Sequence, residues 1–290
     1  MISKLLYYLF ILPISKLPFA LLYRLSDVMY FLIYYLFPYR KKVVLQNLRI
    51  AFPEKTAAER KRICKEFYSH FIDLIFETIK VFSLDKETLQ KHFQITNPEV
   101  LDQYHQQNKS VILVTGHYCN WEWAALTFST KTVFKTMGIF KPLSNAFFNQ
   151  LMKDSRGKFG CELCAPKEVA KFFEQTKNQL FAYGFIADQN PSDKNRGHWM
   201  EFFGKQVPVN FGLEKYAKQY NMPVVFANIQ KTSRGHYQLT YEELTNEPNT
   251  FEQGKICEIF MHKLEHIIQQ QPAYWLWTHK RWKHSPDVAR

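Results

Sequence analysis

Cysteine is scarce in this chain of 290 residues, which holds only five. So few thiols, odd in number, do not form a disulfide framework, and the sequence therefore predicts a domain that faces a reducing compartment. Cys161 and Cys164 form a C-x-x-C pair, but a second pair that would complete a zinc site is lacking. The pair is interpreted as two incidental thiols, and we expect neither a metal nor a cofactor.

The chain also lacks an apolar run of the roughly 20 residues that cross a bilayer without interruption. The first 38 residues come closest, with apolar stretches over 5–12 and 28–37 that are separated by a segment containing Pro13 and Pro18. No small-residue cleavage site follows, which argues against a signal peptide. Three interpretations stay open: one imperfect span over about 5–25, two interfacial helices, or a helical hairpin buried in the core.

A basic flank favours membrane attachment among these interpretations. Arg40-Lys41-Lys42 follows the second apolar stretch, as expected for a cytoplasmic boundary under the positive-inside rule. We therefore expect residues 1–38 to anchor the protein in a membrane. Residues 39–290 are expected to form a catalytic domain that faces the cytoplasm.

Acidic residues are outnumbered: 26 Asp and Glu stand against 38 Lys and Arg, a net charge of +12. Such a chain favours anionic partners, namely nucleic acid, lipid head groups or an acidic protein. Aromatic residues make up 17% of the chain, and Tyr and Trp suit a boundary with one wet side. No glycine-rich, RNP-like or helix-turn-helix signature is present, so we expect a membrane partner and no nucleic acid, although single-stranded nucleic acid also stacks on aromatic rings.

A compact motif stands in the middle of the chain. The aliphatic run 111–114 is followed by Gly116, His117 and, five positions later, Glu122. This pattern predicts a buried strand, a break and the start of a helix. The imidazole then lies at the carboxyl end of a strand, where α/β sheets usually hold their chemistry.

The spacing of the motif allows His117 to act as a base. Glu122 can fold back toward the ring and fix its tautomer, so that the other nitrogen accepts a proton from a hydroxyl. A purely structural His–Glu pair is the alternative that the spacing leaves open. A zinc site is disfavoured, because His117, Cys119 and Glu122 do not reproduce a familiar ligand spacing.

Strands and helices are expected to alternate through most of the chain, without an internal repeat. Thr56 and Glu59 have the form of a capping box inside a helical region over 41–82. The pattern predicts strands at 110–115, 132–139, 180–187, 224–229 and 237–241, and helices near 121–129, 145–159, 167–175, 213–219 and 250–270. The predicted fold class is α/β: a mixed, largely parallel sheet flanked by helices, preceded by an N-terminal helical membrane-attachment segment.

Several blocks of sequence resemble one enzyme family. The string from Gly116 to Glu122 resembles the H-x4-D/E motif of glycerolipid acyltransferases and, more narrowly, of the late acyltransferases of lipid A biosynthesis, the lauroyl and myristoyl transferases. Further blocks of that family are matched in order at 39–48, 140–145, 155–160, 186–191 and 275–283. The resemblance covers nearly the whole chain. Cys119 departs from it, since glycine is expected there.

The resemblance implies a reaction. A fatty acyl chain would pass from an acyl carrier protein thioester to a hydroxyl of a lipid A precursor at the inner membrane. Both substrates are anionic and suit the net charge of +12. Relatives that acylate other glycolipids or amino-acid lipids leave the acceptor open. A membrane-bound thioesterase or lipid hydrolase, in which His117 activates water, is the alternative reaction.

Roles for individual residues follow from the resemblance and the chemistry. His117 is expected to be the general base, with Glu122 as its orienting partner. Arg156 is expected to bind a substrate phosphate or the oxyanion, because guanidinium groups bind both bidentately. The alternative for Arg156 is a solvated side chain beside Asp154.

Four further residues are candidates for substrate binding: Lys141, Asn145, Asp188 and Gln189. Lys141 and Asn145 lie in the same block before Arg156 and could line the pocket. Asp188 and Gln189 end a predicted strand, so they face the same edge as His117 if the sheet is parallel. The Trp, Lys and Arg cluster at 275–283 rims the membrane face in one interpretation. In the other, its three Trp residues are core and Lys280, Arg281 and Lys283 are solvated.

Overall fold

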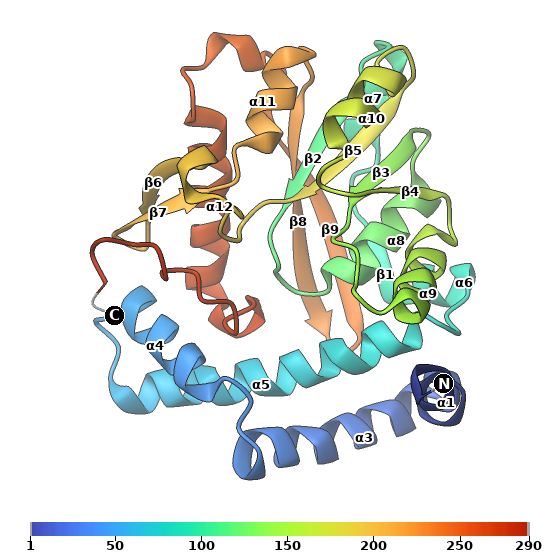
Figure 1. Ribbon diagram of the computed structural model, residues 1–290, viewed down its shortest axis with the longest axis vertical. Coiled ribbons are helices and arrows are strands. Elements are labelled where there is room, and N and C mark those ends of the chain that lie inside the picture. Colours follow the sequence, from blue (N-terminus) through green and yellow to red (C-terminus); the bar gives the residue numbers. More distant parts are fainter. Residues whose placement is uncertain (1, 289–290) are drawn as a thin grey trace.

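The fold is a seven-stranded, mostly parallel sheet covered by helices, seen in the computed structural model, which describes residues 2–288 (Figure 1). The strand order is β1-β9-β8-β2-β5-β3-β4, and only the β8–β9 pair is antiparallel. The strands are β1 Phe93–Ile95, β2 Val111–Thr115, β3 Lys135–Ile139, β4 Cys161–Cys164, β5 Phe181–Ile186, β8 Val224–Ser233 and β9 His236–Thr245. This confirms the predicted α/β class.

Helices cover both faces of the sheet. The shorter ones are α6 Lys86–His92, α7 Glu99–Gln106, α10 Val169–Thr176 and α11 Gly212–Gln219, and the longer ones are α8 Trp121–Lys131, α9 Ala146–Gly157 and α12 Lys255–Gln270. Phe173 of α10 stacks on Tyr216 of α11 at 4.2 Å between ring centroids, so these two helices share one face. Helix α8, which connects β2 to β3, lies on the other face (Figure 1).

Strands β2 and β5 lie side by side and lead in opposite directions. From β2 the chain crosses through α8 to β3, whereas from β5 it crosses through α11 to β8 on the other side of the pair. Neighbouring parallel strands whose connections diverge in this way open a crevice at their carboxyl ends, which is where such folds place their ligands. The residues that follow Thr115 and Ile186 are therefore expected to form the site.

The predicted capping box is present. Helices α4 Lys41–Ala51 and α5 Ala57–Lys80 fill the predicted helical region. The Thr56 hydroxyl accepts a hydrogen bond from the Glu59 amide at 3.2 Å, and the Glu59 carboxylate accepts one from the Thr56 amide at 2.7 Å. These bonds satisfy two amides that the start of a helix leaves free, which fixes where α5 begins.

The N-terminal segment is a chain of helices that packs along α5. It comprises α1 Ile2–Leu6, η1 Tyr7–Ile11, α2 Leu12–Lys16, α3 Phe19–Phe31 and η2 Leu32–Leu36. Helix α3 runs antiparallel to α5, since Tyr23 meets Glu77 and Ser26 meets Asp73 (Figure 1). Leu22 packs against Ile72 and Phe76 in a small apolar cluster.

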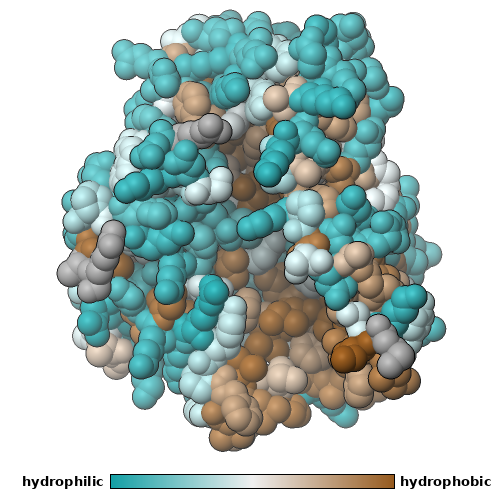
Figure 2. Space-filling model, in the orientation of Figure 1, coloured by the Kyte–Doolittle hydropathy of each residue, from teal (hydrophilic) through white to brown (hydrophobic). Residues whose placement is uncertain are grey.

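The outer side of this segment is apolar and exposed, which argues against a buried hairpin. Figure 2 shows hydrophobic side chains gathered on the part of the molecule that the N-terminal helices form in Figure 1. The stretch Phe19–Leu36 is long and apolar enough to cross a membrane, and only 17% of it is buried. Exposed apolar residues include Leu5, Leu9, Phe10, Leu25, Val28, Phe31 and Phe37.

Candidate active site

His117 lies two residues beyond the end of β2, after a close approach between the chain and helix α12. A Cβ atom at Gly116 would stand 2.7 and 2.8 Å from the two methyl groups of Leu264 on α12, so only glycine fits this turn without displacing that side chain. The imidazole is held at the edge of the sheet, and one fifth of the side chain is exposed.

Asp188 holds the imidazole of His117. In the parallel register Thr115 pairs with Ile186, so the residues two positions further on face each other across the ends of β2 and β5. His117 Nδ1 lies 2.6 Å from Asp188 Oδ1, and the His117 amide donates to Asp188 Oδ2 at 3.0 Å. The strand-end position of Asp188 is as expected, but its expected contact with substrate is not seen: the buried carboxylate is taken up by His117 and Trp275.

This contact corrects the expected partner of His117. The carboxylate of Glu122 contacts Arg156 instead of folding back onto the imidazole. The physical reason is the course of the chain: Glu122 lies in the first turn of α8, where it meets α9. The carboxylate on the ring comes from a neighbouring strand, 71 positions away in sequence.

Burial and hydrogen bonding oppose each other at Asp188, which is 1% exposed. Burial alone raises the pKa of this carboxyl, but the charge and hydrogen bonds of His117 and the hydrogen bond from Trp275 outweigh it and lower the pKa to about 2. Asp188 is therefore ionised across the physiological range and accepts hydrogen bonds only. The neutral imidazole must carry its proton on Nδ1, which leaves Nε2 free to accept another.

The C-terminal segment forms hydrogen bonds with Asp188 and with the turn after β2. The Trp275 indole donates to Asp188 Oδ2 at 2.8 Å, and the backbone at Leu276 and Tyr274 pairs with His117 and Cys119. Sequence reasoning missed Trp275 as a partner of the site, since a single Trp carries no signal of this kind. A buried indole nevertheless needs an acceptor for its N–H.

The Trp residues of the cluster at 275–283 belong to the core, which favours the second interpretation of this cluster. Trp275, Trp277 and Trp282 are buried, and so is Arg281, which was expected to be solvated. Arg281 Nη1 donates to Asn190 Oδ1 at 2.8 Å and to the Pro208 carbonyl at 3.0 Å. Lys280 and Lys283 are exposed as expected.

Glu122 and Arg156 form a second pair beside the first. Arg156 Nε donates to Glu122 Oε2 at 2.9 Å and Nη2 donates to Oε1 at 2.6 Å, a bidentate fork that joins α9 to α8. The Arg156 side chain is 28% exposed, and its Nη1 makes no hydrogen bond within the described residues. Arg156 is therefore paired with Glu122 and is not simply solvated beside Asp154, which accepts a hydrogen bond from Gln150.

Local contacts and backbone conformation define the turn between His117 and Glu122. Asn120 begins α8, and its side-chain oxygen accepts the Trp123 amide at 2.8 Å. Cys119 has a φ of +52°, the left-handed region that favours glycine, which explains why a glycine is expected there. The Trp121 ring packs edge-on against the His117 ring, with the centroids 5.1 Å apart.

The other predicted binding residues make no hydrogen bond to these pairs within the described residues. Asn145 is exposed and caps α9, with Oδ1 accepting the Phe148 amide at 3.1 Å and Nδ2 donating to Ser3 at 2.8 Å. Lys141 is exposed. Gln189 is half-buried next to Asp188, and its carbonyl accepts from Asn210.

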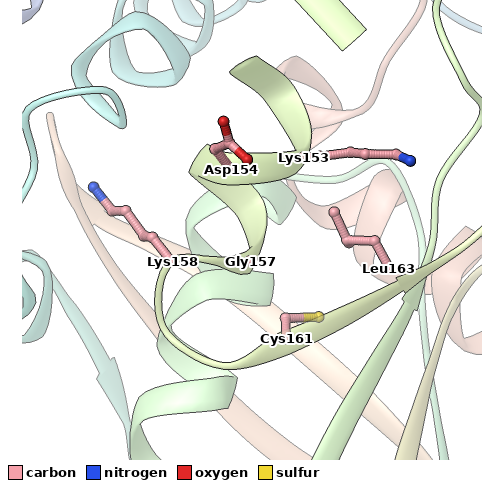
Figure 3. A pocket seen from close by; sticks show the side chains of 6 residues that line it. All are labelled: Lys153, Asp154, Gly157, Lys158, Cys161 and Leu163. Atoms are coloured by element: carbon pink, nitrogen blue, oxygen red, sulfur yellow. The ribbon is translucent and has the colours of Figure 1, made fainter. Parts of the chain in front are cut away.

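Neither of two cavities in the described part of the chain is lined by the His117 or Glu122 pair. One, of about 440 Å³, lies against α9 and β4 and includes Lys153, Lys158 and Cys161 in its lining. Figure 3 shows the two lysine side chains pointing in opposite directions, so their ammonium groups do not converge on one ligand. Lys158 donates instead to the carbonyls of Val81 and Leu84.

Together these features define a class of protein: an α/β enzyme with a carboxylate-held imidazole where two parallel strands diverge, joined to an apolar helical segment. The chain belongs to the bacterial lipid A biosynthesis acyltransferase family, whose pattern it matches over residues 2–284. This confirms the resemblance seen in the sequence blocks, and the protein is an acyltransferase.

The individual proteins to which the chain is similar are also lipid A biosynthesis acyltransferases. The chain is 21% identical to the lipid A biosynthesis lauroyltransferase of Escherichia coli (strain K12), over 94% of this chain and 89% of the relative. It is also 21% identical to the palmitoleoyltransferase of the same strain, over 85% and 80% of the two chains. A lipid A biosynthesis acyltransferase of Haemophilus influenzae is 20% identical over 80% and 72%.

Proposed function

We propose that this protein transfers a fatty acyl chain from an acyl carrier protein thioester to a hydroxyl of a lipid A precursor, at the cytosolic face of the inner membrane. The observation that carries the proposal is the hydrogen bond between His117 and an ionised, buried Asp188 at the diverging strands. It leaves Nε2 of His117 as the group that accepts the proton of the acceptor hydroxyl.

The reaction then follows simple acyl-transfer chemistry. As His117 Nε2 takes the proton, the hydroxyl oxygen attacks the thioester carbonyl, forming a C–O bond and an oxyanion. Collapse of this intermediate breaks the C–S bond, and the imidazolium returns the proton to the thiolate. Asp188 stabilises the imidazolium between these two transfers. No covalent enzyme intermediate is needed, because the thioester is already activated.

Arg156 is the group we assign to the negative charge of the substrates. Glu122 fixes the guanidinium plane through a bidentate contact and leaves Nη1 for an oxyanion or a phosphate oxygen. Glu122 is thus assigned to the orientation of Arg156, and Asp188 to that of His117. Lys141, Asn145 and Gln189 are weaker candidates for substrate contacts, since the first two are exposed and Gln189 is only half-buried.

The apolar N-terminal helices support membrane attachment. Their exposed side is apolar, while the inner side of α3 makes polar contacts with α5. This division suits residues 1–38 lying in the membrane interface, with the domain formed by residues 39–290 facing the cytoplasm. An acceptor with several acyl chains stays in the bilayer, since each buried methylene contributes about 0.8 kcal/mol. The site must therefore reach the acceptor there.

The test uses purified protein in vesicles that contain a lipid A precursor, supplied with acyl carrier protein or coenzyme A carrying the same acyl chain. Mass spectrometry of the lipids should reveal a new ester with the carrier protein as donor, and none with His117→Ala. Free fatty acid without ester would instead support a thioesterase or lipid hydrolase. Ester on another glycolipid or amino-acid lipid alone would change the acceptor, and equal use of coenzyme A would change the donor.

A further inference from the structure

A fully buried carboxylate on α5 lies between the N-terminal helix α3 and the turn that carries His117 and Glu122. Glu77 is 0% exposed and has no part in the reaction described above. Its Oε1 accepts a hydrogen bond from the Tyr23 hydroxyl of α3 at 2.8 Å. Its Oε2 accepts from Asn120 Nδ2 at 2.7 Å and from the Tyr237 hydroxyl at 2.8 Å.

The Asn120 contact reaches the centre of the turn over residues 117–122, which we call the catalytic turn. Asn120 lies three residues after His117 and two before Glu122, and its other side-chain atom caps α8. The Trp123 indole also donates to the Glu77 carbonyl at 3.0 Å. Two hydrogen bonds from the start of α8 therefore end on Glu77, one on its carboxylate and one on its backbone carbonyl.

The Tyr23 contact reaches the helix whose outer side is apolar and exposed. Other hydrogen bonds also join α3 to the body, but by a different route: Ser26 donates to Asp73 at 2.7 Å, and Arg234 bridges Asp73 and Asp27. Asp73 makes no hydrogen bond to α8 within the described residues. Among the carboxylates of the described residues, Glu77 alone accepts hydrogen bonds from both α3 and the catalytic turn, although Phe19 of α3 also packs on Trp123 of α8 with the ring centroids 6.0 Å apart.

We propose that Glu77 is a positioning residue that couples the placement of α3 to the geometry of the turn bearing His117 and Glu122. The proposal rests on the proposed function, because it concerns the residues assigned to catalysis there. A buried carboxylate oxygen that loses a donor is left unsatisfied. Glu77 would then rotate toward its remaining donors or admit water, and Asn120 would lose its fixed partner.

The ionisation of Glu77 depends on its hydrogen bonds and on the charges around it. Burial raises the pKa of Glu77 to about 7, while the bonds from Tyr23 and Tyr237 and the Lys231 charge lower it and Asp73 raises it. The carboxylate therefore depends on these two hydroxyl donors to stay ionised near neutral pH. Removing the Tyr23 hydroxyl therefore disfavours the ionised form of Glu77, which is the form that accepts the hydrogen bond from Asn120.

Two matched substitutions test the coupling in the full-length protein in vesicles. Tyr23→Phe and Ser26→Ala each remove one hydrogen bond from α3 to a buried carboxylate of α5, but only the first carboxylate holds the catalytic turn. Tyr23→Phe is expected to lower kcat about tenfold with little change in the KM for the acceptor, as for a slightly misplaced catalytic group. Ser26→Ala is expected to stay within about twofold of wild type. Thermal unfolding and vesicle co-sedimentation should change equally in both.

A third substitution tests the route. Asn120→Ser keeps an oxygen that can cap α8 but is too short to reach Glu77. If both substitutions interrupt one route, the Tyr23→Phe, Asn120→Ser double variant should have the kcat of Asn120→Ser alone. Wild-type kcat in Tyr23→Phe, an equal loss in Ser26→Ala, or multiplied losses in the double variant would overturn the coupling. If wild type releases fatty acid and forms no ester, the proposed reaction fails, and the same comparison of hydrolysis rates still tests the coupling.

Discussion

At the scale of single residues, the imidazole of His117 has one ring nitrogen committed to Asp188 and one available for chemistry. Asparagine has nearly the shape of aspartate, but its amide can donate to Nδ1 and favour the tautomer with the proton on Nε2. Asp188→Asn should therefore lower kcat by on the order of a hundredfold or more, close to the loss in His117→Ala. The rate of ester formation measures this.

Glu122→Gln is the comparison for this prediction. It removes a charge from the Arg156 pair and leaves the His117–Asp188 contact intact, so the loss should be smaller than in Asp188→Asn. A nearly inactive Glu122→Gln beside an active Asp188→Asn would contradict our assignment of the orienting role to Asp188.

Arg156 uses two of its nitrogens on Glu122, and a lysine cannot reproduce this fork. We expect Arg156→Lys to keep a charge in the site but to lose its fixed direction, giving a partial defect of about tenfold in kcat/KM. Arg156→Ala should lose more. Kinetics with a dispersed acceptor measure both, and equal rates for wild type, Lys and Ala would remove Arg156 from the site.

Glu77 predicts a pH dependence of stability. Its pKa in the folded protein is about 7, against an ordinary value of 4.5, mainly because of burial. The folded protein therefore binds the proton more tightly, so the stability that this group contributes is present below about pH 4.5 and is lost as the pH rises through 7. The loss is on the order of 3 kcal/mol.

Denaturant unfolding at pH 5 and pH 8 measures this effect. Wild type should lose free energy of unfolding between these pH values relative to Glu77→Gln, which cannot titrate. Parallel pH profiles for the two proteins would mean that Glu77 titrates in the folded state much as it does in the unfolded chain.

At the scale of elements, the contact between the β2–α8 turn and α12 depends on Gly116. Leu264 is fully buried, so it has little room to move away from an added methyl group. Gly116→Ala should cost about 1–3 kcal/mol of stability and displace His117. Gly157 at the end of α9 is the control: a Cβ there meets nothing within 4 Å. Gly157→Ala should change stability by less than about 1 kcal/mol.

Thermal unfolding and the rate of ester formation check the pair of glycine variants. The prediction concerns both quantities, since a displaced His117 should slow transfer even where the protein remains folded. Equal stability and activity in the two variants would mean that the turn accommodates a Cβ at either position.

The main elements could be predicted from sequence because they are long and regular. The central strands and the helices between them all appear at their predicted places, although β8 and β9 each end four residues beyond the predicted range and α12 begins five residues later. The short helices α6 and α7 were not predicted. Strands β1 and β4 were missed, since three or four residues do not establish a periodicity. The hairpin β6 His198–Phe202 and β7 Lys205–Val209 was also missed. Its turn has positive φ at Phe203 and Gly204, where Asn-Gly is the usual signal.

The site was only partly predictable for a related reason. The motif placed His117 at the end of a strand, and the polar pair 188–189 could be assigned to the same edge. Which carboxylate contacts the ring depends on the register between β2 and β5, which pairs residues 71 positions apart. The sequence near His117 favoured Glu122 because it is local, and the tertiary contact with Arg156 takes Glu122 away.

At the scale of the whole molecule, α5 lies between the sheet and most of α3 (Figure 1). Its Glu77 carboxylate accepts hydrogen bonds from Asn120 of the catalytic turn and from Tyr23 of α3, whose outer side is apolar (Figure 2). Deleting the N-terminal segment would uncover Ile72 and Phe76, which pack on Leu22. A loss of activity after deletion would therefore not separate membrane attachment from folding.

Substitutions on the outer side alone separate the two effects. Leu25 and Val28 of α3 are 40% and 60% exposed, so glutamate at both positions leaves the contacts with α5 in place. Each buried apolar side chain contributes about 1.5–3 kcal/mol to transfer from water. The Leu25→Glu, Val28→Glu variant should therefore bind vesicles more weakly by a factor on the order of a hundred or more, while it keeps its rate on detergent-dispersed acceptor. Val133→Glu is the control, because Val133 is 59% exposed but lies outside the N-terminal segment. Vesicle co-sedimentation of the three proteins decides the matter: unchanged binding of the α3 variant would mean that this apolar side does not contact the membrane.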